Sequence, residues 1–226
     1  MCSEVTPIIE VVCEGYPVDF VTKFADFRKL GRFTDVTLRV AGEEMVAHRA
    51  VLSAASPVFN AMFDDAFAET KKEVVDLHHE TTPKVMAAIL DYVYSGKLKM
   101  NVEYFTLFLR NADYFGLEGL KNELPKALST RLNANNCIST LVLAVENGLD
   151  DLMNKAKQIL VSHYQSINTS KEIQMLTKKQ LELILNLVQQ SPATQKYAAI
   201  MHWIKYDELN RQDYMYDLAS KYVNKM

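Results

Sequence analysis

The sequence predicts an α+β domain in about the first 125 residues and an all-helical domain after it. Apolar and polar residues alternate from Phe33 to Val40, which is typical of a half-buried β-strand. From Cys137 onward the apolar residues recur only at helical spacing. A length of 226 residues allows one or two domains of ordinary size.

Further short elements are expected around the first strand. Residues 42–44 form a turn, and a second short strand begins at residues 45–46. Residues 48–63 then have a helical pattern, and residues 74–77 have the composition of a further strand. A helix over residues 103–115 carries too many apolar side chains for one narrow stripe.

Two segments precede the first strand. Residues 7–13 are β-prone and end at Gly15, Tyr16 and Pro17. The segment that follows has a helical apolar pattern up to Gly31. Because an isolated β-prone run gains little stability without a neighbouring strand, a frayed tail is one interpretation of residues 7–13.

Capping signals divide the second half into helices. Pro125 suits the first turn of a helix, and the side chains of residues 133–136 offer an N-cap for a helix that ends at Gly148. Thr177 and Gln180 form a capping box. The connections between successive helices are short, so we expect stacked helical hairpins.

Composition excludes several classes of protein. Hydrophobic residues make up 49% and charged residues 23%, which is ordinary for a globular protein. The net charge of −3 gives no electrostatic footprint for nucleic acid, and no apolar run approaches the roughly 18 residues that a membrane helix needs. Cys2, Cys13 and Cys137 are widely spaced, which indicates reduced thiols in the cytosol or the nucleus.

The candidate catalytic and metal-binding residues have simpler structural interpretations. Asp35 and His48 are a conceivable acid–base pair, but no nucleophile stands at a suggestive spacing. The adjacent His78 and His79 would point to opposite faces of a strand, so we expect a solvated turn there. The sequence contains no dinucleotide-binding, P-loop or nucleophile-elbow motif. We therefore expect no enzyme activity, no cofactor and no metal.

Taken together, the segments resemble two known domains. Those that are similar to the BTB domain, also called POZ, are residues 31–40, 47–63, 67–69, 90–96 and 111–117. Those that resemble the BACK domain of kelch-like proteins are residues 136–138, 144–148 and 199–207, the last with Trp203 as an expected core residue. The resemblance implies a BTB domain with a small mixed sheet covered by helices at residues 16–125. It implies an N-terminal extension at residues 1–15 and a BACK domain of helical hairpins at residues 126–226.

The resemblance also implies a binding site for Cullin-3. Phe67 and Glu69 stand where many BTB proteins have an apolar-x-Glu motif that holds the cullin N-terminal domain. Tyr104, Asn111 and Tyr114 are expected on the outer side of the helix at 103–115, where they would line the same groove. The first BACK helices, roughly residues 128–164, would extend that groove.

A homodimer is the second implication. In the family the first helix forms much of the dimer interface, and a strand ahead of it can pair with the partner subunit, which is the other interpretation of residues 7–13. The interface residues implied here are Val18, Val21, Phe24, Leu30 and Asp35.

The function implied by the resemblance is that of a substrate adaptor of a Cullin-3–RING E3 ubiquitin ligase in the cytoplasm or the nucleus. Kelch-like proteins bind substrate through a glycine-rich propeller, and this chain has only 7 glycines. The substrate protein is therefore unknown, and it would bind through a missing or separate domain. The chain is either a fragment of a kelch protein or a kelch-less form that competes with full-length adaptors. The alternative is a dimeric interaction scaffold or transcriptional co-regulator that does not bind a cullin.

Overall fold

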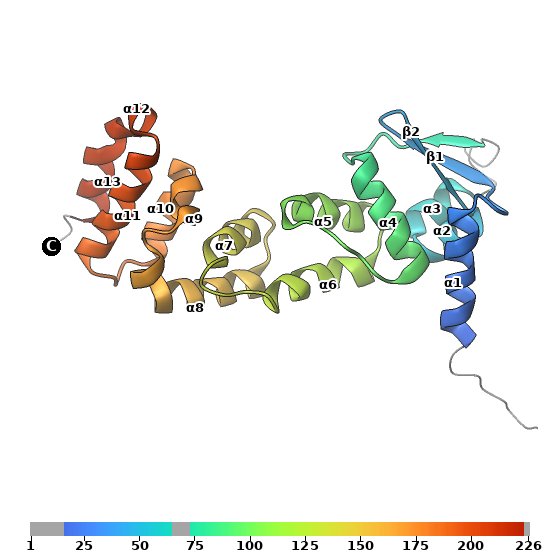
Figure 1. Ribbon diagram of the computed structural model, residues 1–226, viewed down its shortest axis with the longest axis horizontal. Helices are drawn as coiled ribbons and strands as arrows, with labels where there is room; N and C mark the ends of the chain where they lie inside the picture. The colour runs from blue at the N-terminus through green and yellow to red at the C-terminus, as the bar shows by residue number, and fades with distance from the viewer. Residues whose placement is uncertain (1–15, 65–72, 224–226) are drawn as a thin grey trace, which may run out of the picture. The chain divides into compact units, whose positions relative to one another are not determined.

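The computed structural model describes residues 16–64 and 73–223, and Figure 1 shows the order of their elements. Side chains are described from Phe20 onward. The chain divides into two compact units, residues 1–121 and 122–226. This division lies near the expected domain boundary between residues 125 and 126.

The first unit contains a three-stranded mixed sheet in the order β2-β1-β3. Strand β1 (Val36–Val40) pairs antiparallel with β2 (Glu43–Ala47) and parallel with β3 (Val74–Asp76). Val36, Leu38 and Val40 are buried, so one face of β1 forms part of the core. The predicted small mixed sheet is confirmed.

The other face of the sheet carries charges of opposite sign in register. Arg39 lies opposite Glu44 on β2 and Asp76 on β3. Its guanidinium is 2.7 Å from the Glu44 carboxylate and 3.4 Å from that of Asp76. Opposite charges on paired strands favour this register over a shifted one.

The strand expected from Phe33 begins only at Val36. Phe33 itself has a φ of +60°, a left-handed conformation that is rare for a bulky residue. The buried positions of β1 are Val36, Leu38 and Val40, and Phe33 lies out of phase with them. The apparent alternation therefore extended the prediction by three residues.

The helices of the first unit follow in sequence order, and the last of them, α6, continues into the second unit. They are α1 (Tyr16–Lys29), α2 (Arg49–Ala55), α3 (Pro57–Met62), α4 (Pro83–Ser95), the 3-10 turn η2 (Val102–Tyr104), α5 (Phe105–Tyr114) and α6 (Glu118–Ser129).

The helical run expected from residue 48 to 63 is split at Ser56. Pro57 disfavours a helical conformation at the residue before it, and Ser56 is extended. The Ser56 hydroxyl accepts the N–H of Phe59 at 3.2 Å and donates to the carbonyl of Phe115 at 2.6 Å. One serine thus caps α3 and ties it to the end of α5.

Helix α6 corrects one expectation. Pro125 lies inside this helix and not in its first turn, because the helix begins at Glu118. The proline removes one backbone hydrogen bond from the helix, and the sequence pattern alone did not show that the helix continues through it.

The second unit is all-helical, as predicted. Its elements are α7 (Cys137–Glu146), α8 (Asp150–Ile167), α9 (Lys171–Met175), α10 (Lys178–Leu187), α11 (Ala193–Tyr206), α12 (Glu208–Arg211), η3 (Gln212–Tyr214) and α13 (Met215–Tyr222). The Thr177–Gln180 capping box is present, and Gly148 ends α7 in a left-handed conformation. Trp203 is buried in the core of this unit, and its indole N–H donates to the carbonyl of Leu176 at 2.7 Å.

The cap of α7 differs from the prediction. Asn136 occupies the N-cap position, but its side chain makes no capping bond. The Glu172 carboxylate accepts the backbone N–H groups of Ile138 and Ser139 instead, at 3.3 and 3.1 Å. A negative group at a helix N-terminus is favourable, and this one comes from a residue far along the sequence.

We expect Gly116→Ala to destabilise the protein more than Gly96→Ala. Both glycines have a φ near +65°, so both substitutions strain the backbone by about 1–2 kcal/mol. At Gly116 a Cβ would also lie 2.6 Å from Pro57 Cγ, whereas nothing lies within 4 Å at Gly96. Overpacking adds roughly 1–3 kcal/mol. Urea unfolding of both variants measures the difference, and equal losses would contradict the packing argument.

We expect the Cys137 thiol to resist alkylation in the folded protein. Cys137 is buried, and burial, assisted by the charge of Glu172, raises its pKa to about 11. About one thiol in a thousand is then ionised at pH 8. Mass spectrometry after iodoacetamide treatment at pH 8 should find the Cys137 peptide unlabelled until urea is added. Rapid labelling without urea would show that the site is open.

Candidate functional site

Helix α1 and the turn after it expose apolar side chains. Phe20 is 51% exposed, Val21 43%, and Leu30 and Phe33 69% each. Exposed apolar side chains that lie close together on a monomer mark interaction sites. The name α1 face is used below for the four exposed apolar side chains of α1 and the turn after it, which are Phe20, Val21, Leu30 and Phe33.

The aromatic rings of this region touch one another in sequence. Phe20 and Phe24 have ring centroids 5.1 Å apart, Phe24 and Phe27 6.2 Å, and Phe27 and Phe33 5.0 Å, all in edge-to-face geometry. Edge-to-face pairs are favourable and fix each ring relative to the next. The ladder links the exposed rings Phe20 and Phe33 through the half-buried Phe24 and Phe27.

Arg28 and His48 hold α1 on the domain. The Arg28 guanidinium lies 2.9 Å from the Asp91 carboxylate, donates to the carbonyl of Val46 at 3.3 Å and lies 5.3 Å from the ring centroid of Tyr94. The ring of Phe24 packs edge-on against the imidazole of His48 at 5.6 Å. These contacts leave the α1 face outward.

The residues implied for a dimer interface lie in different environments. Val21 and Leu30 belong to the α1 face, and Phe24 is half-buried behind it. Val18 lies on α1, and its side chain is outside the described residues. Asp35 is exposed, and its carboxylate accepts the N–H of Arg49 at 2.7 Å, at the start of α2.

Asp35 and His48 form no acid–base pair in these contacts. Because the Arg32 carbonyl can only accept, the 3.0 Å contact assigns the ring proton of His48 to Nε2. The Tyr94 hydroxyl lies 2.9 Å from Nδ1 and accepts the His48 backbone N–H at 2.8 Å. His48 precedes α2, as expected, and its polar atoms are occupied by structural bonds.

Helix α5 presents two tyrosines. Tyr114 is 47% exposed, and Tyr104, just before the helix, is half-buried. The Lys84 amine lies 4.7 Å from the centroid of the Tyr104 ring. Tyr114 is thus exposed on the first unit, and Tyr104 only in part. Their contribution to a cullin groove stays a prediction.

Asn111 does not share that outer surface, and its expected placement is wrong. Its side chain is fully buried, although it stands on the same helix. Its amide donates to the carbonyls of Leu107 and Glu80 at 2.8 and 3.1 Å, and its oxygen lies 2.7 Å from Nε2 of His79. The amide satisfies its hydrogen bonds inside the domain, so it fixes the segment before α4.

His79 corrects a second expectation. It is not in a solvated turn, because its ring stacks on that of Tyr114 and is hydrogen-bonded to Asn111.

Phe67 and Glu69, the implied cullin motif, lie outside the described residues.

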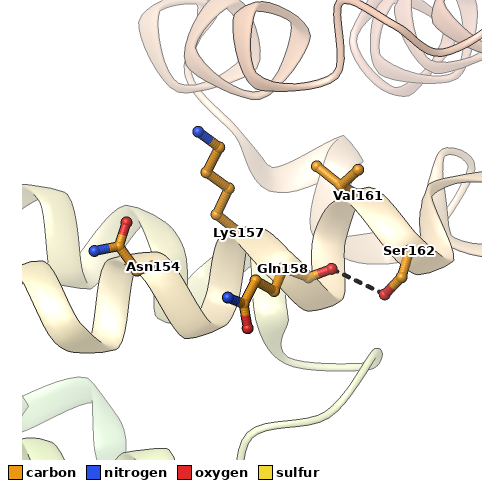
Figure 2. Close-up of a pocket in the computed structure, with 5 residues that line it drawn as sticks. All are labelled: Asn154, Lys157, Gln158, Val161 and Ser162. Carbon is orange, nitrogen blue, oxygen red and sulfur yellow. Dashed lines mark hydrogen bonds between the residues drawn. The ribbon is translucent and has the colours of Figure 1, made fainter.

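A shallow hollow on the second unit offers little chemistry. It has a volume of about 640 Å³, and the residues that line it all come from α8: Asn154, Lys157, Gln158, Val161 and Ser162 (Figure 2). The Ser162 hydroxyl donates to the carbonyl of Gln158 at 2.9 Å, which is common for a serine within a helix. None of these five described residues carries a carboxylate, imidazole or thiol to act as an acid–base group.

Within residues 16–64 and 73–223, no three His, Cys, Asp or Glu side chains come together as a metal site. None of the described helices has the length and apolar character to span a bilayer.

Sequence reasoning missed three residues that contribute to these surfaces. Phe20 is not among the implied interface residues, Phe33 was expected in a strand, and His79 in a solvated turn. The alternation itself could have placed Phe33 outside the core. The buried residues of the strand have even numbers, 36, 38 and 40, whereas residue 33 falls on the opposite, exposed side of the alternation. No local signal identifies His79, since its partners are more than 30 residues away.

Two family models match the chain. The model "BTB/POZ domain" matches residues 24–132, and "BTB And C-terminal Kelch" matches residues 137–222. This chain is a BTB–BACK protein of the kelch-like family. The recognised fold, a BTB domain followed by a helical BACK domain, is therefore confirmed, and no kelch region lies in these 226 residues.

Several kelch-like proteins are similar to this chain over most of its length. Kelch-like protein 7 of Homo sapiens is 29% identical over 204 residues, covering 89% of this chain and 35% of that protein. Kelch-like protein 25 of Xenopus laevis is 27% identical over 196 residues, covering 84% and 33%. The chain thus spans about a third of the length of these relatives.

A solved structure is also similar. The BTB domain of zebrafish PATZ1 is 26% identical, with a TM-score of 0.48, and the match covers 54% of this chain and 99% of that one.

Proposed function

We propose that this chain is an adaptor subunit that dimerises through its BTB domain and binds the N-terminal domain of Cullin-3 in a RING E3 ubiquitin ligase. The observation that carries the proposal is a BTB domain with exposed aromatic side chains on both α1 and α5. Exposed aromatic anchors are the side chains that contribute most to protein–protein binding. Partner enzymes would perform the chemistry, and the adaptor would supply proximity.

The homodimer would use the α1 face. Its four side chains are apolar, and a second copy of the same face could cover it around a two-fold axis. Val18, Phe24 and Asp35 would complete this interface with Val21 and Leu30. Two protomers would give two binding arms and a higher effective concentration of partners.

The cullin site would combine the tyrosines of α5 with the segment around residue 67. Tyr114 supplies an exposed ring and Tyr104 a half-buried one, and Phe67 and Glu69 are proposed from the family motif. Asn111 would act from inside the domain through the residues it holds. The first BACK helices, residues 128–164, would extend the site.

A substrate is not identified by these residues. In kelch-like proteins the propeller would bind the substrate, so here the substrate protein would bind through a separate region. The alternative roles are a scaffold and a competitor of full-length adaptors. The binding experiment below distinguishes a scaffold that does not bind cullin from a cullin-binding subunit. A cytoplasmic or nuclear location would fit either role.

We expect the double substitution Leu30→Asp with Phe33→Asp to convert the dimer to a monomer. Each of these anchors should contribute about 2 kcal/mol or more to association, and aspartate tolerates the positive φ at residue 33 better than phenylalanine does. Light scattering measures the mass, and circular dichroism checks the helix content.

The matched control is Leu209→Asp, at a leucine that is 89% exposed in the BACK unit. This variant should remain dimeric. A wild-type monomer, or a dimer that survives the double substitution, would rule out the α1 face.

We expect Phe67→Ala and Tyr114→Ala each to weaken binding to the Cullin-3 N-terminal domain. Loss of an aromatic anchor costs about 2–4 kcal/mol of binding free energy. Isothermal titration measures the affinity, and light scattering should show one cullin domain per protomer on an intact dimer. The melting temperature of both variants should stay near that of wild type.

Tyr216→Ala is the control, because this tyrosine is 84% exposed in the other unit. It should bind cullin as wild type does. Absence of binding by an intact wild-type dimer would favour a scaffold or co-regulator, and unfolding of Phe67→Ala would mark Phe67 as a core residue.

A further inference from the structure

His79 and Tyr114 form a parallel stack at the surface of the BTB domain. Their ring centroids lie 4.2 Å apart with an interplanar angle of 4°. The ring of Phe115, which is fully buried, meets the His79 ring edge-on at 4.8 Å and 88°. The imidazole is therefore held between a core ring and the exposed phenol.

Hydrogen bonds fix the imidazole in one orientation. Asn111 Nδ2 faces two carbonyl oxygens, so Oδ1 is the atom that faces His79 Nε2 at 2.7 Å. An amide oxygen only accepts, and so Nε2 carries the ring proton. The buried amide thereby holds the ring, and the ring supports the phenol of Tyr114.

The second ring nitrogen indicates that the imidazole does more than fill space. Nδ1 of His79 is buried and has no hydrogen-bond partner among the residues that the structure describes. A buried unpaired acceptor costs free energy, which an aliphatic side chain would avoid. An aliphatic side chain, however, would offer neither a flat face to Tyr114 nor a donor to Asn111.

We infer that His79 is a positioning residue for Tyr114 and sets the orientation of this phenol on the cullin-binding surface. The inference rests on the proposed function. A side chain that is held in its bound orientation loses less conformational entropy when a partner binds. His79 thus increases affinity through Tyr114 by means of the stack. The partner surface that fits is an apolar hollow with a polar group for the phenolic hydroxyl.

A double-mutant cycle tests the inference. Titration with the Cullin-3 N-terminal domain gives the affinity of wild type, His79→Ala, Tyr114→Ala and the double variant. We expect His79→Ala to weaken binding about 3- to 10-fold in the wild-type background. In the Tyr114→Ala background the same substitution should change the affinity by less than about 2-fold, because its effect passes through the missing ring.

His79→Phe separates the stack from the hydrogen bond. Phenylalanine keeps a flat ring against Tyr114 but leaves the buried oxygen of Asn111 without its donor. We expect its cullin affinity to stay within about 2-fold of wild type while its urea midpoint falls. If His79→Ala does not fold by circular dichroism, His79→Leu replaces it as the variant without a ring.

The outcomes distinguish the two proposals. No binding by wild-type protein overturns the cullin function itself. Binding that depends on Tyr114 but not on His79 overturns the positioning role and leaves the function standing. A loss from His79→Ala that is equal with and without Tyr114, or a loss that follows stability in His79→Phe, also overturns it.

Discussion

Tyr94 of α4 is the side chain on which the placement of α1 depends. Its hydroxyl accepts the backbone N–H of His48 and lies within hydrogen-bond distance of the His48 ring, and its own ring lies under the Arg28 guanidinium. Burial is the largest cause that raises the pKa of Tyr94, so the phenol stays neutral and able to donate. One group therefore connects α4 to α1 and to the start of α2. These contacts hold α1, and with it the series of aromatic rings from Phe20 to Phe33, in place on the domain.

Local patterns predicted the elements well and their contacts poorly. The Thr177–Gln180 box and Gly148 are local signals that appear as expected, and the alternation predicted β1 but placed its start three residues too early. The cap of α7 and the burial of Asn111 depend on partners about 30 or more residues away, which no local pattern contains. Of the candidate site, the exposed position of Tyr114 on α5 followed from helical spacing, whereas the position of His79 did not. Its contacts form only when the segment after β3 meets α5 in the fold.

Long-range polar contacts have the same importance in the BACK unit. Arg211 donates to the carbonyls of Gln174 and Trp203 at 2.8 and 2.9 Å, and its guanidinium lies 4.4 Å from the centroid of the Trp203 ring. One side chain thus satisfies carbonyls from separate helical segments and covers the core tryptophan. Arg211 thus links α9 to α11, and Glu172 links α9 to the start of α7. These directional bonds fix the helices along their axes, which apolar contacts alone specify less strictly.

The left-handed backbone of Phe33 has a consequence for natural and engineered variation of this protein. A glycine or asparagine there would relieve the strained conformation and stabilise the isolated subunit. The same change would remove an aromatic ring that is 69% exposed and lies on the surface proposed for association. Stability of the subunit and the proposed association therefore favour different residues at this one position. A redesign that optimises the folding of single chains would therefore tend to remove a side chain of the proposed association surface.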